Sequence, residues 1–251
     1  MWASLRTEGD WPEVVVFRRG WGRASARPWN PLTEAASVRL VRGTSAFLSE
    51  VRDRAGQLSG GPVLSPALYP SASAIWVRAG FSPLLFLSIM EQSIGITQGA
   101  PDGVELVTEP DLDALESLDR EAFDPFWHMG GAGLREALAA TPASAVLQTS
   151  SGGAPTGYAL VGAQLGVSFL QRIAVSPRER GQGLGRSLID AARSWAKSVG
   201  AVSMVLNVRP DNEPAIRLYE RCGFEMTRGE LQVMQWTPDT IQREPDASRN
   251  T

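Results

Sequence analysis

The chain has 251 residues, which is enough for one large domain or two small ones, each with its own core. A hydrophobic fraction of 43% and a charged fraction of 20% are those of an ordinary globular protein, and the formal net charge of -3 offers no basic surplus, so we expect no nucleic-acid partner. The single cysteine and single histidine exclude a disulfide framework within the chain and a metal centre built from such residues.

We expect no targeting or membrane segment in the first part of the chain. Charges are scattered through Met1–Phe17, and the longest apolar run, Pro83–Met90, is too short to span a bilayer. We therefore expect a cytoplasmic protein without a membrane partner. Within this part, the residue pattern predicts a helix at Ser45–Ala55 and a strand at Val63–Leu64.

Glycine and other turn formers interrupt the chain at Gly95–Gly103, which is typical of a linker. We therefore divide the chain into a first unit, residues 1–95, a linker, residues 96–103, and a second unit, residues 104–236. The remaining residues, 237–251, lack periodicity and are expected to form a disordered tail.

Apolar periodicity and turn signals predict the elements of the second unit. In chain order they are a strand at Val104–Val107, a helix at Leu112–Ala122 preceded by Asp111, a loop at Phe123–Gly133, a short helix at Leu134–Ala140, strands at Ala145–Thr149, Gly157–Ala163 and Gly166–Val175, a helix at Leu184–Val199, a strand at Val202–Val208, a helix at Glu213–Arg221, and final strands at Phe224–Met226 and Leu231–Trp236. This order predicts an α/β fold, with a mixed central sheet flanked by helices.

Two distant segments of the chain resemble each other. When Ser65–Phe81 is aligned with Arg209–Phe224 on their shared Gly-Phe ends, Trp76 falls on Tyr219. A predicted helix and strand precede each segment. We therefore predict that the first unit is a truncated, diverged copy of the second. Chance similarity between two strand–helix–strand segments is the alternative.

The segment Arg180–Gly185 (RGQGLG) lies between a predicted strand and a predicted helix. A helix N-terminus leaves backbone N–H groups without partners, and glycines let an anion approach them, so this segment is suited to hold a phosphate. A dinucleotide fingerprint requires G-x-G-x-x-G and a P-loop requires G-K-[ST], and the segment matches neither. The plain alternative is a structural loop with solvated arginines.

Together with a later motif, this segment resembles the GNAT superfamily of acyl-CoA-dependent N-acyltransferases. The Arg/Gln-x-x-Gly-x-Gly/Ala signature of that family is matched at Arg180, Gly183 and Gly185. Its later N-x-x-A-x-x-L-Y-x-x-x-G-F pattern is matched at Asn212, Ala215, Leu218, Tyr219, Gly223 and Phe224. The resemblance covers residues 104–236, and it reaches the first unit only through the repeat. It implies a GNAT-like second unit preceded by a smaller, partial GNAT-like unit.

The resemblance implies that acetyl-CoA is bound between the strand ending near Val175 and the strand Val202–Val208. Its pyrophosphate would meet backbone N–H groups of the glycine segment, and its pantetheine arm would pair with the preceding strand. The implied binding residues are Ile173, Ala174, Val175, Arg180, Gly181, Gln182, Gly183, Leu184, Gly185, Arg186, Asn212, Ala215 and Tyr219.

The implied reaction is direct attack of a neutral amine on the thioester in a ternary complex. The backbone N–H of Val175 is the candidate donor to the carbonyl oxygen. Tyr219 is the candidate general acid, because a tyrosine stays protonated at neutral pH. Cys222 is expected to be a small buried core residue rather than a nucleophile.

The acceptor side is less defined by the sequence. The segments Glu121–Trp127 and Leu206–Asn212 resemble ribosomal-protein alanine N-acetyltransferases, which usually carry a glutamate base where this chain has Asn207. Asn207 cannot take up a proton, so the identity of the general base stays open. Either Glu121 or Asp124 acts through a water molecule, or the reaction needs no base. The candidate acceptor-side residues are Phe126, Trp127, His128 and Asn207.

The leading prediction is an acetyl-CoA-dependent N-acetyltransferase whose amine acceptor is a small molecule or a peptide N-terminus. The alternatives are a non-catalytic acyl-CoA-binding sensor and an interaction module in which the tryptophan-rich start of the chain docks a partner. A homodimer is a candidate assembly. Pairing a degenerate copy with an active one also resembles mycothiol synthases, at the level of architecture alone.

Overall fold

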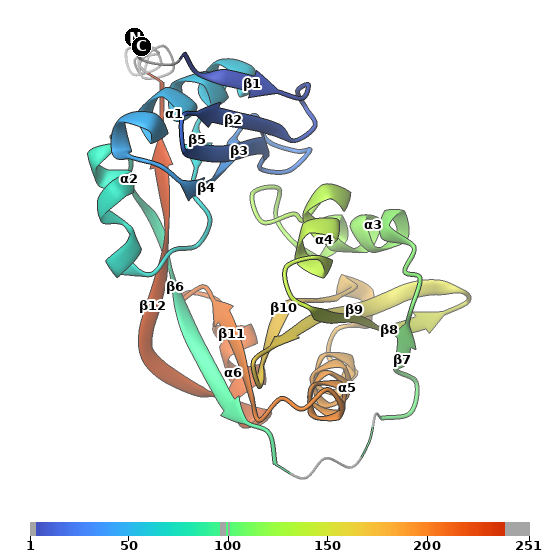
Figure 1. Ribbon diagram of the computed structural model, residues 1–251. Coiled ribbons are helices and arrows are strands. Elements are labelled where there is room, and N and C mark those ends of the chain that lie inside the picture. Colours follow the sequence, from blue (N-terminus) through green and yellow to red (C-terminus); the bar gives the residue numbers. More distant parts are fainter. Residues whose placement is uncertain (1–3, 96–98, 100, 239–251) are drawn as a thin grey trace, which may run out of the picture. The chain divides into compact units, whose positions relative to one another are not determined.

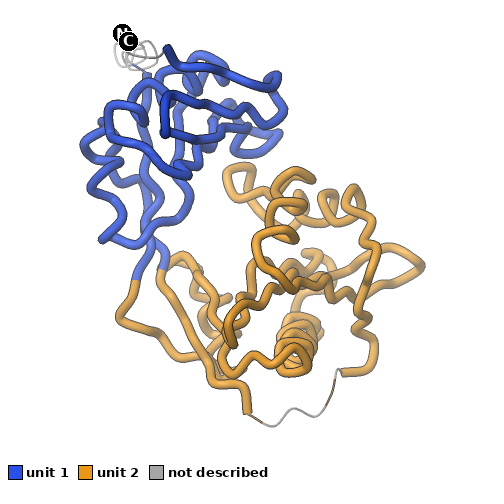
Figure 2. Tube along the Cα trace, viewed as in Figure 1, with its two compact units in different colours: residues 1–87, 230–251 blue, residues 88–229 orange. Residues whose placement is uncertain are grey.

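The computed structural model describes residues 4–95, 99 and 101–238. The chain divides into two compact units, one of residues 1–87 and 230–251 and the other of residues 88–229 (Figure 2). In the described ranges, no helix is long and apolar enough to cross a membrane. Half of the predicted linker, residues 96–98 and 100, lies outside the described residues, and so does most of the predicted tail, residues 239–251.

The first unit begins with an antiparallel meander that was not predicted from the residue pattern. Its strands are β1 (Arg6–Glu8), β2 (Val15–Arg19), β3 (Gly22–Pro28) and β4 (Ala36–Arg42). Helix α1 (Ser45–Ser59) then connects β4 to the parallel strand β5 (Val63–Leu64). Alternate residues of β2 and β3 are buried against α1, which gives this unit its own core.

Helix α1 has clear start and stop signals. The Thr44 side chain accepts a hydrogen bond from the Phe47 N–H, and Gly60 ends the helix with a φ of 73°. The left-handed conformation at this position favours glycine, because glycine lacks a Cβ. The helix is therefore longer than the predicted Ser45–Ala55.

The second unit contains a sheet in the order β6-β11-β10-β9-β8-β7, in which only β10 and β11 pair in parallel. The elements are β7 (Glu105–Val107), α3 (Leu112–Ala122), α4 (Gly131–Leu138), β8 (Ala143–Ser151), β9 (Ala154–Gln164), β10 (Val167–Val175), α5 (Leu184–Ser198), β11 (Ser203–Val208) and α6 (Glu213–Arg221). These agree closely with the predicted elements, except that α4 begins three residues earlier than predicted.

Helices cover both faces of this sheet (Figure 1). Leu147 of β8 and Val161 of β9 pack in the cluster that contains α5, whereas Val146 and Leu160 pack in the cluster with α3 and α4. Because successive side chains of a strand point to opposite faces, both faces of β8 and β9 are buried. This confirms the predicted mixed sheet flanked by helices.

Two long strands cross the boundary between the units. Strand β6 (Ser82–Ser93) follows the short helix α2 (Ala74–Arg78) of the first unit, yet its end pairs with β11 of the second. Strand β12 (Glu225–Trp236) follows α6 of the second unit, yet its end pairs with β5 of the first. The predicted units, residues 1–95 and 104–236, therefore differ from the compact units. Each copy contributes its last strand to the other copy, and β12 is one continuous strand where two were predicted.

The two helix–strand junctions have the same geometry. The Phe81 N–H donates to the Trp76 carbonyl at 3.0 Å, and the Phe224 N–H donates to the Tyr219 carbonyl at 3.0 Å. The glycine before each phenylalanine has a φ near 90°, at 86° and 90°. Each phenylalanine also packs edge-on against its partner ring, with centroid distances of 4.9 and 5.8 Å. These shared contacts agree with the predicted alignment of the two copies.

Candidate active site

The glycine segment forms the N-terminus of α5. Gly181 and Gly183 have φ values of 81° and 86°, and a Cβ at either position would meet nothing within 4 Å. Gly183 is the N-cap, and no side chain caps the helix. The first helical hydrogen bond runs from the Ser187 N–H to the Gly183 carbonyl at 3.1 Å, so the N–H groups of residues 184–186 precede the helical ladder. This open helix end provides donors and partial positive charge for an anion.

The third glycine of the segment has a packing role. A Cβ on Gly185 would lie 3.0 Å from the Leu218 Cδ2 of α6, which is tighter than an ordinary contact. The absence of a side chain therefore lets α5 and α6 approach each other beside the open helix end.

Strands β10 and β11 separate directly before this helix end. They pair only from Val167 to Phe169 of β10, and no pairing joins the later residues of the two strands. Beyond that point β10 pairs only with β9, and β11 pairs with β6. Backbone groups on the facing edges of β10 and β11 therefore remain without strand partners.

The direction of the free backbone groups follows from strand geometry. The Ser176 N–H donates to the Thr156 carbonyl, just beyond the β9 pairing, at 2.9 Å. Because backbone groups alternate between the two edges of a strand, those of Ile173 and Val175 face the opposite edge, toward the separation, and those of Ala174 face β9. The predicted pantetheine-pairing residues Ile173 and Val175 thus lie on the open edge. The N–H of Val175 is also the predicted oxyanion donor.

The basic and polar side chains of the glycine segment have local partners. Arg180 donates to the Ala122 carbonyl at the end of α3 at 2.9 Å and to the Val175 carbonyl at 3.4 Å, so it joins the segment to α3 and β10. The Gln182 side-chain amide donates a hydrogen bond to the Glu179 carboxylate at 2.8 Å. The Arg186 side chain is 65% exposed and lies 3.7 Å from Asp190, so its charge remains at the helix end.

Tyr219 lies on the buried face of α6 and is only 7% exposed. Its hydroxyl makes no hydrogen bond with the described residues. Burial raises the pKa of Tyr219 to about 12, so the hydroxyl keeps its proton at neutral pH. Cys222 is buried in the same cluster, as expected, and burial raises the pKa of its thiol as well.

The other residues of the second motif have structural contacts. The Asn212 side chain caps α6 by accepting a hydrogen bond from the Ala215 N–H at 3.3 Å. Asn207 of β11 is exposed and pairs in register with Ile89 of β6. Asn212 thus fixes the start of the helix that bears Tyr219, and Asn207 places an uncharged amide on the strand opposite β10.

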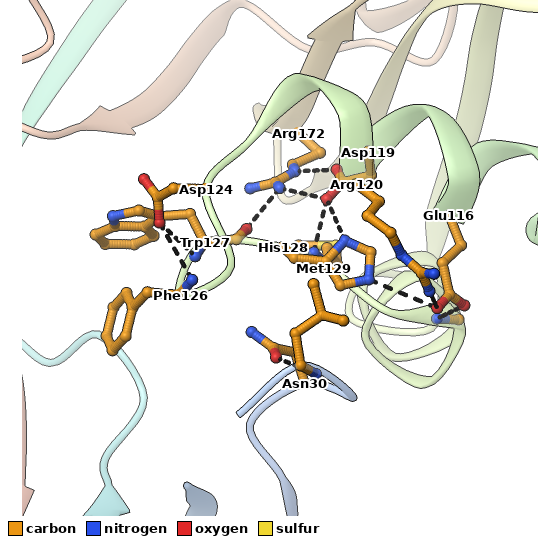
Figure 3. A network of polar contacts seen from close by, with 12 residues as sticks. Asn30, Glu116, Asp119, Arg120, Asp124, Phe126, Trp127, His128, Met129 and Arg172 are labelled. Carbon is orange, nitrogen blue, oxygen red and sulfur yellow. Dashed lines mark hydrogen bonds and ion pairs between the residues drawn. The ribbon is translucent and has the colours of Figure 1, made fainter. Parts of the chain in front are cut away.

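The aromatic loop, residues 123–130, is held by a buried carboxylate (Figure 3). Asp119 of α3 is fully buried and accepts two bonds of 2.7 Å from Arg172 of β10. It also accepts a hydrogen bond from the Tyr158 hydroxyl and another from the Met129 N–H, each of 2.7 Å. Arg172 in turn donates to the Trp127 carbonyl at 2.7 Å. The loop is thereby fastened to the strand that carries Ile173 and Val175.

The predicted acceptor-side residues of this loop occupy different environments. The rings of Phe126 and Trp127 are partly exposed and meet edge-on at 5.2 Å. The His128 ring is fully buried, 3.3 Å from an Asp119 oxygen and 3.5 Å from a Glu116 oxygen. We therefore assign His128 to the support of the loop, whereas the acceptor-side role of Phe126 and Trp127 stays a prediction.

The sequence motifs did not predict roles for Asp119, Arg172 and Arg209. Asp119 follows Leu118 on the apolar face of its helix, and Arg172 interrupts an apolar strand, so each was a charged residue at a position expected to be buried. Arg209 lies 5.7 Å from the Trp127 ring centroid and 3.5 Å from Asp124, and it joins the β11–α6 loop to the aromatic loop.

Comparison with known proteins identifies this region. Residues 112–224 match the model described as "Acetyltransferase (GNAT) family". A mycothiol acetyltransferase from Pseudarthrobacter chlorophenolicus is 28% identical over 221 residues, covering 80% of this chain and 65% of that protein. A streptothricin acetyltransferase from Escherichia coli is 39% identical over 60 residues, covering 24% of this chain and 34% of that one.

The fold has solved relatives as well. A tandem GNAT protein from the clavulanic acid biosynthesis pathway aligns with a TM-score of 0.59 at 16% identity, covering 89% of this chain and 82% of that one. The match to the GNAT acetyltransferase family thus covers residues 112–224, slightly less than half of the chain, and the solved relative shows the same fold over most of it. The chain spans slightly less than two thirds of the mycothiol acetyltransferase, and about a third of the streptothricin acetyltransferase.

Proposed function

We propose that this protein is an N-acetyltransferase that moves an acetyl group from acetyl-CoA to a primary amine. The observation that carries the proposal is the uncapped N-terminus of α5, which follows β10, the strand that separates from β11, after a 3-10 turn at Pro177–Glu179 and the glycine segment. Phosphate groups are stabilised at such a helix end. The unpaired edge of β10 offers backbone groups to an amide-containing chain that leads away from the phosphates.

The donor would be held by two sets of backbone groups. N–H groups of the loop and first turn, Gly181 to Arg186, would bind the pyrophosphate, and Arg186 would add charge. Ile173 and Val175 would pair with the pantetheine arm. Ala174 and Ala215 would shape the site through packing, and Asn212 would act through its cap on α6.

The proposed reaction needs no covalent intermediate with the protein. The amine nitrogen attacks the thioester carbonyl, the new C–N bond forms, and the C–S bond breaks. The Val175 N–H stabilises the negative charge that develops on the carbonyl oxygen. The Tyr219 hydroxyl, which keeps its proton at neutral pH, would donate a hydrogen bond and then its proton to the departing thiolate as the C–S bond breaks.

The amine must lose a proton in the same sequence of steps. Asn207 cannot accept it. Glu121 and Asp124 are exposed, and Asp124 already accepts hydrogen bonds from the N–H groups of Phe126 and Trp127. We therefore propose that the amine binds in its neutral form or releases its proton to water, and that turnover rises with pH up to the pKa of the amine.

The relatives favour a small molecule as the acceptor. Both curated relatives carry names that refer to small molecules, mycothiol and streptothricin. The partly exposed rings of Phe126 and Trp127 would supply an apolar wall for such an acceptor. A peptide N-terminus is the other acceptor to be tested.

Calorimetric titration of the protein with acetyl-CoA tests the proposal, with NADH as a comparison ligand. We expect micromolar binding of acetyl-CoA, lost in Gly183→Asp, because that change adds bulk and negative charge at the helix N-terminus. The matched control is Gly200→Asp, which places the same side chain just beyond the other end of α5, where φ is 85° and the space is also open. A panel of amines, followed by mass spectrometry for acetylated product, then identifies the acceptor. Absence of acetyl-CoA binding would refute the proposed activity, and binding without any product would favour an acyl-CoA sensor.

A further inference from the structure

Four arginines lie directly opposite one another across the first four strands. The strand register pairs Arg6 with Arg18, Arg18 with Arg23, and Arg23 with Arg42. Neighbouring strands are about 4.8 Å apart, so the four positions form a row of about 14 Å across β1 to β4. We call this row the arginine ladder.

The ladder faces away from the core of its own unit. Phe17 and Ala24, the chain neighbours of Arg18 and Arg23, are fully buried on the other face. Because side chains alternate along a strand, the ladder arginines point to the opposite side of the sheet. Arg6, Arg23 and Arg42 are exposed, and the side chain of Arg18 is 43% exposed.

Repulsion within the ladder is only partly compensated. Like charges directly opposite each other destabilise a sheet. Glu8 lies 3.3 Å from Arg18, whereas Arg6, Arg23 and Arg42 have no carboxylate partner among the described residues. Residues 1–87 contain ten arginines against six aspartates and glutamates, so this segment is basic within an acidic chain. The ladder therefore suits a ligand with several negative charges in a row.

An aromatic side chain lies in the turn beside the ladder. Gly20 and Trp21 form the turn between β2 and β3, two residues beyond the Arg18–Arg23 pair. Gly20 has a φ of 56°, which suits the first position of a tight hairpin turn. Trp21 is 61% exposed, although tryptophan is usually buried. An exposed indole beside a row of cations offers a stacking surface for a base next to phosphate-binding groups.

We propose that the arginine ladder and Trp21 bind single-stranded nucleic acid, with phosphates along the ladder and one base on the indole. Arginine suits this task because its planar guanidinium binds phosphate with two parallel hydrogen bonds. The whole-chain charge, which led us to expect no nucleic-acid partner, hides this local surplus. The activity is separate from acetyl transfer, since no residue of the ladder belongs to the second unit.

An anionic membrane surface is the other occupant that arginines and tryptophan would suit. The turn favours nucleic acid, because glycines flank Trp21 on both sides and no aliphatic residue adjoins it in the chain to enter a bilayer. An acidic peptide would be attracted to the ladder but would not use the indole as a stacking surface.

Fluorescence anisotropy with a labelled oligothymidylate tests the proposal. The probe has about 12 nucleotides, within the range that single-strand-binding folds cover. Saturating acetyl-CoA is present, so that the probe cannot bind at the donor site. We expect a dissociation constant on the order of 1–100 μM at moderate salt. Affinity should fall with rising salt, with a logarithmic slope of about -0.7 for each phosphate contacted.

Two variants separate the ladder from general charge. In Arg23→Gln/Arg42→Gln, the salt slope should shrink by about 1.4, since two phosphate contacts are lost. The control, Arg54→Gln/Arg78→Gln, removes the same charge from exposed helix positions in the same unit and should bind as the wild type does. Trp21→Ala should weaken binding at least about fivefold without changing the salt slope, because stacking does not release counterions.

Three results would overturn the proposal. The wild type could fail to bind the probe at low salt, or both double variants could lose affinity equally, which would indicate general electrostatic attraction. The protein could also sediment with phosphatidylserine vesicles, in a way that Trp21→Ala abolishes, and fail to bind the oligonucleotide. That result would make the surface a membrane site. Thermal melts of each variant confirm that the fold is retained, since all the changed side chains are on the surface.

Discussion

Arg172 of β10 donates two parallel hydrogen bonds to the buried carboxylate of Asp119 on α3, each 2.7 Å long. The guanidinium carbon also lies 3.5 Å from the centroid of the Phe123 ring. Arg172 directly precedes Ile173, which lies on the open edge of β10. The pair therefore fixes the aromatic loop and the proposed donor-binding strand relative to each other, within one unit of the protein.

Asp119→Ala should lower the free energy of unfolding by about 3–5 kcal/mol, because it leaves the buried guanidinium of Arg172 without its counter-charge. The Tyr158 hydroxyl and the Met129 N–H also lose their acceptor. Urea denaturation monitored by tryptophan fluorescence measures the change.

Asp113→Ala is the matched control, because Asp113 is exposed in the first turn of the same helix. Its loss should cost less than about 1 kcal/mol, the usual size of a helix-dipole interaction. Equal losses in the two variants would show that the buried ion pair contributes nothing beyond helix stability.

Tyr219→Phe should lower kcat by about 10²-fold and leave acetyl-CoA affinity nearly unchanged, because it removes a proton donor but keeps the ring in its packing site. Steady-state kinetics across pH, together with calorimetry, separate the two effects. Tyr158→Phe is the control: it removes a buried tyrosine hydroxyl from the same unit, at a position bonded to Asp119, and should lower stability rather than kcat. Unchanged turnover in Tyr219→Phe at every pH would remove this residue from the acid role.

Most elements of the second unit could be predicted because their periodicity is local. Asp111 caps α3 as expected, and α6 has the predicted bounds, Glu213–Arg221. The destination of β6 and β12 could not be predicted, because strand pairing depends on partners far away in the sequence. The meander of the first unit was missed because the buried positions of β3 hold only glycine and alanine, so the alternation of apolar and polar residues is weak although burial alternates along the strand.

The candidate site shows the same limit. The glycine segment and Tyr219 follow from motifs that are continuous in the sequence. The network of Asp119, Arg172 and Tyr158 joins residues from three elements, and only packing brings these side chains together. His128 illustrates the consequence, since its position in an aromatic loop suggested a surface contact, whereas its ring is fully buried.

Stability should decline in alkaline solution because two tyrosines are buried. Burial raises the pKa of Tyr219 to about 12, and burial followed by the charge of Asp119 raises the pKa of Tyr158 well above its usual value. A pKa that is higher in the folded state stabilises the fold fully below the unfolded value of about 10, and this contribution disappears as pH rises through the folded value. Urea denaturation should therefore give a constant contribution from these groups between pH 7 and 9 and a decline above about pH 10.

The Tyr219→Phe variant isolates one of these groups. Between about pH 10 and 12 the wild type should lose roughly 2 kcal/mol more than this variant does, most of the amount that corresponds to the raised pKa. If the free energy of unfolding fell in parallel with pH for the two proteins in this range, the burial of Tyr219 would not be the cause of the alkaline decline.

The crossing of β6 and β12 predicts how the chain tolerates truncation. A fragment of residues 104–236, the unit expected from sequence, lacks β6, which covers one edge of β11. An uncovered strand edge pairs with other chains, so this fragment should aggregate or unfold well below the melting temperature of the intact protein. A fragment of residues 82–236 restores β6 and should recover solubility and acetyl-CoA binding. Circular dichroism melts and size-exclusion chromatography compare the two. Cooperative, monomeric folding of residues 104–236 alone would show that β11 does not need β6, and that the predicted boundary is an adequate one.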